Sequence, residues 1–177
     1  RVAAQQLPPK GPIFGQPRDQ ARLSAHGFEA FRPVADTPFE WQGIQLFRTD
    51  GKHGQGIVGY AMGGVSGFVL KAAGEPTVYI AGDTIWCSAV QQAIELHRPD
   101  VIVVNSGAAQ FNFGAPIMMT AEAVIQVCQT APYAKVVTIH MEAINHCRLT
   151  RQALTDAVKK AQATEQVIIP RDGDTVI

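Results

Sequence analysis

The clearest pattern in the chain is a set of short apolar runs separated by stretches with helical spacing. Residues 101–104 and 136–139 are apolar or nearly so throughout, and residues 77–81 are rich in β-forming side chains. Such runs are typical of strands that are buried on both faces. Residues 88–97 carry apolar side chains at helical spacing, and Pro99 ends that stretch. Strands that alternate with helices of about ten residues predict an α/β layered fold.

Capping residues indicate two more helices in the same half of the chain. Thr120 is a good N-cap for a helix that runs to about residue 129, with Glu122 near the positive end of the helix dipole. Thr150 caps a helix to about residue 161 in the same way. Residues 167–170 then form a last strand before an Asp172-Gly173 turn. The alternation of strands and helices is therefore expected to continue to the end of the chain.

The first half of the chain has weaker signals. The prolines in residues 7–12 indicate a surface connection that leads into a short strand. Residues 19–26 are predicted as a short helix that stops at Gly27. Residues 39–47 alternate between apolar and polar side chains, as in a half-buried strand. We expect a glycine-rich loop over residues 51–64, followed by a strand over residues 66–70.

Composition and charge restrict the class of protein. The chain has 177 residues, which fits a single domain over residues 1–177. Apolar residues make up 46% and charged residues 17%, which is typical of a globular chain. Fifteen basic residues balance fifteen acidic ones, so no overall charge attracts nucleic acid. No apolar stretch approaches the ~20 residues of a membrane span. We therefore expect neither nucleic acid nor a membrane as a partner.

The cysteines and the start of the chain bear on its location. Cys87, Cys128 and Cys147 are odd in number and widely spaced, which argues against a disulfide framework and against a thiolate zinc site. The chain does not start with the pattern of a signal peptide. Three reduced thiols in a cytoplasmic protein are the expectation.

Polar side chains stand where the predicted strands end. Asp83 follows one strand, Asn105 follows another, and His140 follows a third. In an α/β sheet the carboxyl ends of the strands face one rim, and ligands gather there. We therefore expect these three side chains to converge, although they lie far apart in the sequence.

Two histidines and an aspartate offer the ligands of a metal site. His53 lies among glycines that let the backbone approach a site closely. With Asp83 and His140 it gives a cysteine-free set that suits Zn²⁺, Mn²⁺ or Fe²⁺. Each residue alone also has a structural explanation: Asp83 as a turn or cap residue, His140 as a core residue at a strand end, and His53 as an ordinary loop histidine. His26 and His97 are interpreted as helix-end residues, the latter as an imidazolium favoured by the helix dipole.

The order His53-Gly54, Gly82-Asp83-Thr84 and Ile139-His140 resembles the metallo-β-lactamase-fold hydrolases. The stretch from residue 65 to Asp83 is similar to the hairpin that leads to the bridging aspartate of that family. The closer resemblance is to a bacterial branch of sugar-lactone-type and uncharacterised hydrolases, and it covers residues 12–177.

The resemblance implies an αββα sandwich with two divalent metal ions at one edge, zinc first, with manganese or iron as alternatives. His53 would bind the first metal, Asp83 would bridge the two metals, and His140 would bind the second. A metal-bound hydroxide would then attack a small ester, lactone or phosphoester substrate. The chain would be a metal-dependent hydrolase of small molecules.

One feature of the family is not found in residues 1–177. Its His-x-His-x-Asp-His signature, which would supply further ligands, should precede His53. Residues 1–8 resemble the helix that follows this signature. We therefore expect the chain to be the C-terminal portion of the hydrolase, with the N-terminal part of the fold missing. On its own the chain should bind metal weakly and catalyse poorly.

His146 is a further catalytic candidate beside Asp83. It lies six residues after His140, within reach of the same rim, and could act as a general acid on the leaving group or serve the following helix. Glu142 offers similar chemistry, and Asn105-Ser106-Gly107 is either a source of hydrogen bonds to substrate or a structural turn.

Two other classes of protein compete with the metal-dependent hydrolase. A non-catalytic binding or assembly module of the same fold is the alternative function, and it fits a chain without the signature. A haloacid-dehalogenase-type phosphatase is disfavoured, because the only Asp-x-Asp is Asp172-Gly173-Asp174, near the end of the chain.

Overall fold

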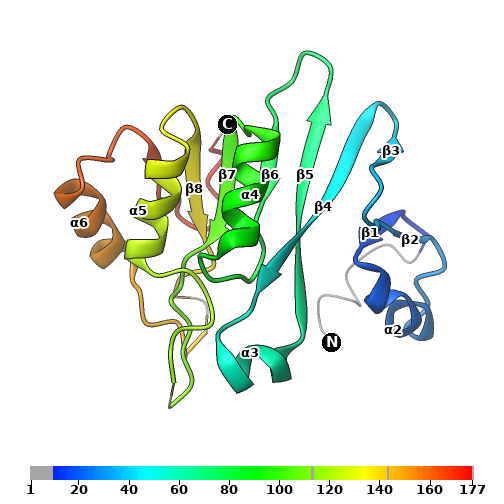
Figure 1. Ribbon diagram of the computed structural model, residues 1–177, viewed down its shortest axis with the longest axis horizontal. Helices are drawn as coiled ribbons and strands as arrows, with labels where there is room; N and C mark the ends of the chain where they lie inside the picture. The colour runs from blue at the N-terminus through cyan, green and yellow to red at the C-terminus, as the bar shows by residue number, and fades with distance from the viewer. Residues whose placement is uncertain (1–9, 113, 143, 177) are drawn as a thin grey trace.

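The computed structural model describes residues 10–112, 114–142 and 144–176. The main body is a seven-stranded sheet in which the strands follow one another in chain order (Figure 1). The strands are β3 (Phe39–Trp41), β4 (Ile44–Lys52), β5 (Gly64–Ala72), β6 (Val78–Ile80), β7 (Val101–Asn105), β8 (Lys135–Ile139) and β9 (Val167–Ile168). Strands β3 to β6 pair antiparallel, whereas β6 to β9 pair parallel. The predicted α/β architecture is confirmed.

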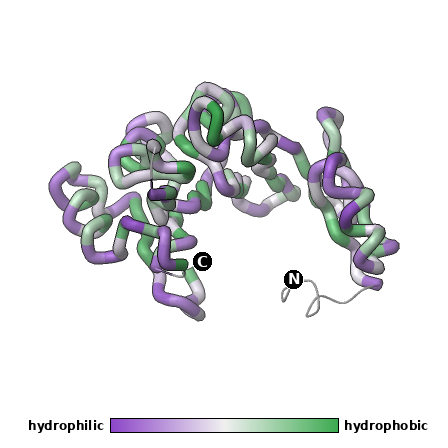
Figure 2. Tube along the Cα trace, turned by 90° about the horizontal axis from the view of Figure 1, so that it is seen from below, coloured by the Kyte–Doolittle hydropathy of each residue, from purple (hydrophilic) through white to green (hydrophobic). Residues whose placement is uncertain are grey.

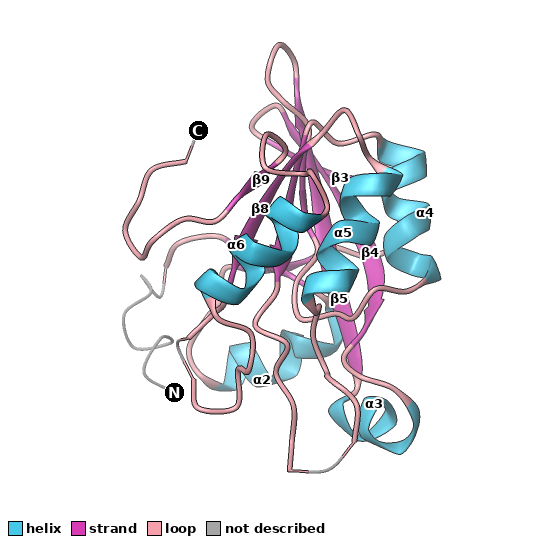
Figure 3. Cartoon of the chain, turned by 90° about the vertical axis from the view of Figure 1, so that its left-hand side faces the viewer, coloured by secondary structure: helices cyan, strands magenta, loops and turns pink. Residues whose placement is uncertain are grey.

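Three helices cover one face of the sheet (Figure 3). They are α4 (Ser88–His97), α5 (Ala121–Thr130) and α6 (Arg151–Lys160), and each follows a strand of the parallel half. Right-handed strand–helix–strand crossovers that all move along the sheet in the same direction place their helices on the same face. Val69, Tyr79, Ile102 and Val136 lie side by side in neighbouring strands, and all four are buried in the core with these helices.

The opposite face of the sheet is also apolar. Phe68, Ile80 and Val103 are partners in adjacent strands, and Ile139 continues this face along β8. Ile80 is 40% exposed and Ile139 is 38% exposed. The helix layer and the main sheet are therefore two layers of a sandwich whose second sheet face is only partly covered by the described residues.

The N-terminal segment forms a smaller unit. Strand β1 (Ile13–Gly15) pairs parallel with β2 (Phe31–Pro33), and between them lie a 3-10 turn, η1 (Pro17–Asp19), and α2 (Gln20–Ala25). Figures 1 and 2 place this unit beyond β3 and β4, away from α5 and α6. The short strand and the short helix are both confirmed, whereas the predicted helix over residues 1–8 lies outside the described residues.

The prediction of one strand over residues 39–47 is wrong. The chain instead makes a hairpin in which Trp41 of β3 pairs with Ile44 of β4. Gln42 and Gly43 form the turn, with φ angles of 50° and 81°. Two consecutive left-handed residues are the requirement of a type I′ turn, whose twist matches that of the strands. A glutamine before the glycine is a weaker turn signal than asparagine or aspartate, so the alternation of residues 39–47 predicts one unbroken strand.

The predicted loop over residues 51–64 is also wrong in part. Strand β4 continues to Lys52, and residues Gly56–Met62 form a short helix, α3. Glycine disfavours helices, which is why the sequence pattern indicates a loop. Here a glycine is required, because a Cβ at Gly59 would lie 2.6 Å from the carbonyl oxygen of Gly54. The helix therefore packs against the loop that carries His53.

Both predicted threonine caps are present. The side chain of Thr120 accepts a hydrogen bond from the backbone N–H of Ala123, and that of Thr150 accepts one from Ala153. We expect Thr150→Ala to lower the free energy of unfolding by about 1 kcal/mol, because one N–H at the start of α6 loses its acceptor. Urea denaturation measures this change. Thr150→Ser keeps the oxygen and should cost less than half as much; equal losses would contradict the capping role.

His97 differs from its interpretation as a dipole-stabilised imidazolium. Its ring packs on Phe47 with 4.9 Å between ring centroids. Burial lowers the pKa of His97, and the nearby Lys71 lowers it further, so the neutral ring is favoured. The three cysteines are free thiols. None of the helices in the described parts of the chain is long and apolar enough to cross a membrane.

Candidate metal centre

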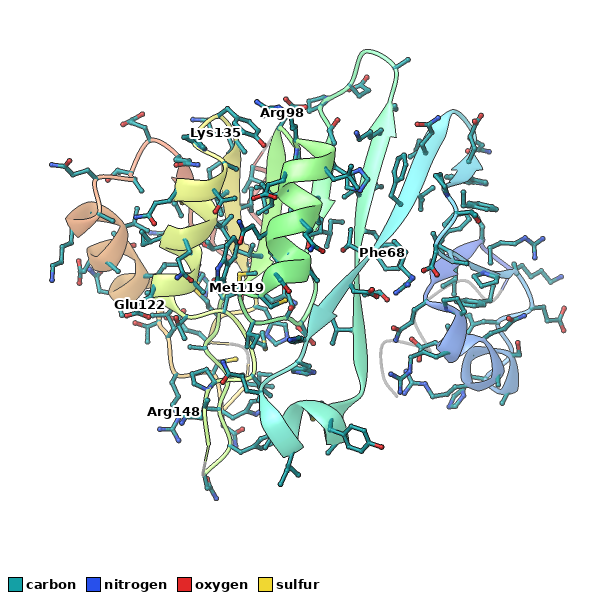
Figure 4. All side chains as sticks on the ribbon, viewed as in Figure 1. Phe68, Arg98, Met119, Glu122, Lys135 and Arg148 are labelled. Carbon is teal, nitrogen blue, oxygen red and sulfur yellow. The ribbon has the colours of Figure 1, made fainter. Side chains whose placement is uncertain are left out.

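The three proposed ligands come from segments that leave the same rim of the sheet. His53 directly follows β4, Asp83 follows β6, and His140 directly follows β8. In Figure 4, Lys135 at the start of β8 lies at the top, so the carboxyl end of that strand points to the bottom, where Arg148 is labelled. Nε2 of His140 lies 4.0 Å from Oδ1 of Asp83. The sheet therefore brings together residues that are 57 positions apart in the sequence (140 − 83).

His53 belongs to the same neighbourhood. Partial burial lowers the pKa of the His53 imidazole, the Asp83 carboxylate raises it, and His140 lowers it. Both neighbours are thus close enough to act on the ring electrostatically. A lowered pKa favours the neutral imidazole, and only the neutral ring has a lone pair to offer a metal ion.

Asn105, the last residue of β7, holds the aspartate. Its amide Nδ2 donates a hydrogen bond of 2.6 Å to Oδ1 of Asp83. From the sequence, Asn105 is either a source of hydrogen bonds to substrate or part of a structural turn. Its contact with Asp83 is a role that the sequence does not indicate. An amide donor fixes one carboxylate oxygen and leaves the lone pairs of the other free.

Thr84 anchors the segment after Asp83. It is fully buried, and its hydroxyl accepts a hydrogen bond of 2.9 Å from the backbone N–H of Lys52, next to His53. The hydroxyl also donates to the carbonyl of Ile85 at 2.9 Å. Thr84 therefore ties the segments that carry His53 and Asp83 together. The sequence signal for this role is the Gly82-Asp83-Thr84 motif, from which no role was predicted for Thr84.

The loops after β7 and β8 meet around His140. Ser106 donates its backbone N–H to the carbonyl of Ile139 at 3.0 Å, and Leu149 donates to the carbonyl of Gly107 at 3.1 Å. The Sγ atom of Cys147 lies between these loops, 4.0 Å from Nδ1 of His140. Burial raises the pKa of the Cys147 thiol, and the Asp83 carboxylate raises it further, although a backbone hydrogen bond at Ile144 opposes both.

His146 lines a neighbouring cavity. Its ring stacks on Phe111 with 6.4 Å between centroids and an interplanar angle of 16°. The cavity measures about 590 Å³ and has Arg148, Asn112 and Asn145 in its wall. A general-acid role for His146 stays a prediction.

Glu142 is engaged elsewhere. Its carboxylate accepts hydrogen bonds from the backbone N–H and from Nη1 of Arg151, at 3.0 Å and 2.6 Å. These contacts lower the pKa of Glu142. The residue thus secures the start of α6.

The donor set can be compared with what a metal requires. Two imidazoles and a carboxylate are ligands of Zn²⁺, Mn²⁺ and Fe²⁺. Bonds of about 2.0–2.2 Å put two ligand atoms of a tetrahedral metal roughly 3.3–3.6 Å apart. The 4.0 Å between His140 and Asp83 is therefore close to a shared-metal distance. In residues 10–112, 114–142 and 144–176, however, no group of three or more His, Cys, Asp or Glu side chains is arranged to hold a metal ion. His140 and Asp83 therefore lie near the spacing of two ligands on one metal, but the described residues do not form a complete ligand set.

The fold and this rim define a class of protein. Residues 3–141 match the family model described as the beta-lactamase superfamily domain, and the chain belongs to that family. The predicted resemblance to metallo-β-lactamase-fold hydrolases is thereby confirmed, and so is the fold class.

Particular relatives can then be named. The chain is 37% identical over 177 residues to the UPF0173 protein YddR of Bacillus subtilis (strain 168), covering 98% of this chain and 69% of YddR. Among solved structures, it is similar to an isothiocyanate hydrolase from Delia radicum gut bacteria, with 31% identity and a TM-score of 0.92, over 100% of this chain and 70% of that one. A possible metal-dependent hydrolase from Veillonella parvula DSM 2008 has 32% identity and a TM-score of 0.93, over 99% and 70% of the two chains.

Proposed function

We propose that this chain carries part of the active site of a metal-dependent hydrolase that acts on a small ester, lactone or phosphoester. The observation that supports this most is the approach of His140 to Asp83 within 4.0 Å at the carboxyl rim of the sheet. His53 is the third member, because it lines one cavity with Asp83, and both Asp83 and His140 act on the pKa of its ring. The names of the relatives, a possible metal-dependent hydrolase and an isothiocyanate hydrolase, are consistent with hydrolysis of a small electrophile.

The residues would divide the work as follows. His53, Asp83 and His140 would hold the metals, with the carboxylate of Asp83 oriented by Asn105. The lowered pKa of His53 favours its neutral imidazole, the form that binds a metal. Bound metal ions would lower the pKa of a water molecule and polarise the electrophile. Substrate would enter from the rim, where the cavity beside His146 provides aromatic rings, amides and the Arg148 guanidinium.

The proposal includes the identity of the metal and the location of the protein in the cell. We propose zinc first, with manganese and iron as alternatives, because His and Asp ligands without cysteine suit all three. A cytoplasmic location is proposed from the three free thiols. The expected His-x-His-x-Asp-His segment before His53 stays a prediction, which the codons upstream of Arg1 check.

The alternative is a non-catalytic module of the same fold. It is favoured by one observation, namely that the described residues contain no complete metal-holding group. Metal content separates the two functions.

Metal analysis of the protein expressed from its complete gene tests the proposal. After reconstitution with Zn²⁺, Mn²⁺ or Fe²⁺, we expect about two ions per chain by inductively coupled plasma mass spectrometry. A content near zero in the complete protein after reconstitution would leave the non-catalytic module as the better description.

A further inference from the structure

We propose that Cys147 is a positioning residue for His140. Its thiol faces one nitrogen of the His140 ring and one atom of the His140 backbone. Sγ lies 4.0 Å from Nδ1 and 3.7 Å from the carbonyl oxygen. The other ring nitrogen, Nε2, lies 4.0 Å from Oδ1 of Asp83. The part of this inference that concerns metal binding rests on the proposed function, whereas the part that concerns the ring does not.

The two nitrogens of a neutral imidazole have opposite roles. One carries the proton and donates, and the other keeps a lone pair and accepts. Which one carries the proton is set by the partner of each nitrogen. At His140 the sulfur is the partner of Nδ1, and sulfur is a weak acceptor for an N–H. A proton on Nδ1 leaves the lone pair of Nε2 on the side of Asp83, where a metal ligand needs it.

Cys147 also acts on the backbone of His140. His140 has a φ of 61°, in the left-handed region that residues other than glycine rarely occupy. Such a conformation is unfavourable and persists only where the surroundings hold it. The thiol donates to the carbonyl oxygen of the strained residue. The contact therefore stabilises the conformation that aims the ring.

Gly107 makes room for this arrangement. A Cβ at position 107 would lie 2.3 Å from the carbonyl oxygen of His140 and 2.7 Å from Sγ of Cys147. The backbone after β7 thus closes over the point where thiol and carbonyl meet. Any other residue at position 107 would push the thiol and the His140 backbone apart, so Gly107, Cys147 and His140 form one packed unit.

The test compares Cys147→Ala and Cys147→Ser with the wild type, all expressed from the complete gene. The first readout is the tautomer of His140, measured from the ¹⁵N chemical shifts of the ring before any metal is added. In the metal-free protein the Asp83 carboxylate favours a proton on Nε2, whereas the Cys147 thiol favours one on Nδ1. We therefore expect a larger share of the Nδ1–H tautomer in the wild type than in Cys147→Ala. The second readout is the dissociation constant of Zn²⁺ by competition with a chelator. Loss of an outer partner of a ligand should weaken binding by about 10–100-fold.

Two further variants complete the design. Cys147→Ser keeps a donor and an acceptor at the same position, so it should keep the wild-type share of the Nδ1–H tautomer and recover part of the Zn²⁺ affinity. Cys128→Ala removes a buried thiol from α5, away from the rim, and controls for a general loss of stability. It should leave the His140 tautomer unchanged.

The outcomes are distinguishable. An unchanged tautomer in Cys147→Ala would overturn the positioning role, whatever the metal content. A changed tautomer in a protein that binds no Zn²⁺ would keep the positioning role and refute the proposed metal site. If Cys147→Ala does not fold, Cys147→Ser decides: a wild-type share of the Nδ1–H tautomer in the serine variant supports the role, and a shift toward Nε2–H there contradicts it.

Discussion

Replacing Asp83 by alanine is expected to lower kcat/KM by at least about 10³-fold while the fold is retained. Several kcal/mol of transition-state stabilisation come from the metals in such sites, and a factor of ten in rate corresponds to about 1.4 kcal/mol. The side chain is 41% exposed, so its removal leaves no cavity in the core. Its contact with Asn105 lies at the rim, which also limits the loss of stability. Steady-state kinetics on the protein from the complete gene, with circular dichroism for the fold, measure both effects.

Two comparison variants make the Asp83 result specific. Asp83→Asn keeps the shape of the side chain and removes its charge, so it separates the loss of a ligand from the loss of a contact; we expect it to be nearly as inactive as the alanine variant. Asp156→Asn removes a carboxylate on α6, where it accepts a hydrogen bond from Gln152. It should leave turnover within about twofold, since surface changes have small effects. Wild-type turnover in Asp83→Ala would remove Asp83 from the active site.

Replacing Gly107 by alanine is expected to lower both the free energy of unfolding and the Zn²⁺ affinity of the proposed metal site. The new Cβ would meet a backbone oxygen at 2.3 Å, and a backbone atom cannot rotate away as the end of a side chain can. Overpacking of this kind costs about 1–3 kcal/mol. Because the atoms in conflict belong to His140 and Cys147, the relaxation should move the His140 ring. We expect Zn²⁺ affinity to fall by at least about tenfold, as for the loss of an outer partner.

Gly64→Ala is the matched control for that substitution. A Cβ there would have one close neighbour, the end of the flexible Arg18 side chain at 3.2 Å. Urea denaturation and Zn²⁺ titration of both variants should therefore show a small effect at Gly64 and a large one at Gly107. Equal losses of stability with unchanged Zn²⁺ affinity would show that the Gly107 contact does not support the site.

The sequence was informative wherever a single run of residues determines the structure. The apolar runs before Asp83, Asn105 and His140 are strands, and because parallel strands share a rim, the placement of these three side chains could be expected. The hairpin at Gln42-Gly43 and the helix α3 were missed, since local propensity at those glycines points to an unbroken strand and to a loop. The contact of Cys147 with His140 arises from the packing of two loops. No repeating pattern of apolar and polar residues in the sequence could have predicted it.

The order of the strands has a consequence for how the protein is made. Each strand of the main sheet pairs with the next one in the chain, so the sheet can grow at one edge as the polypeptide leaves the ribosome. Throughout that growth the newest strand offers unpaired amides to any other nascent chain, until the two-residue β9 ends the series with a short edge. His140 joins only after β8 has docked, whereas His53 and Asp83 have long been in place. A stall in translation before residue 140 would therefore leave a partly folded sheet with an unpaired edge strand and without His140, the last of the three proposed ligands.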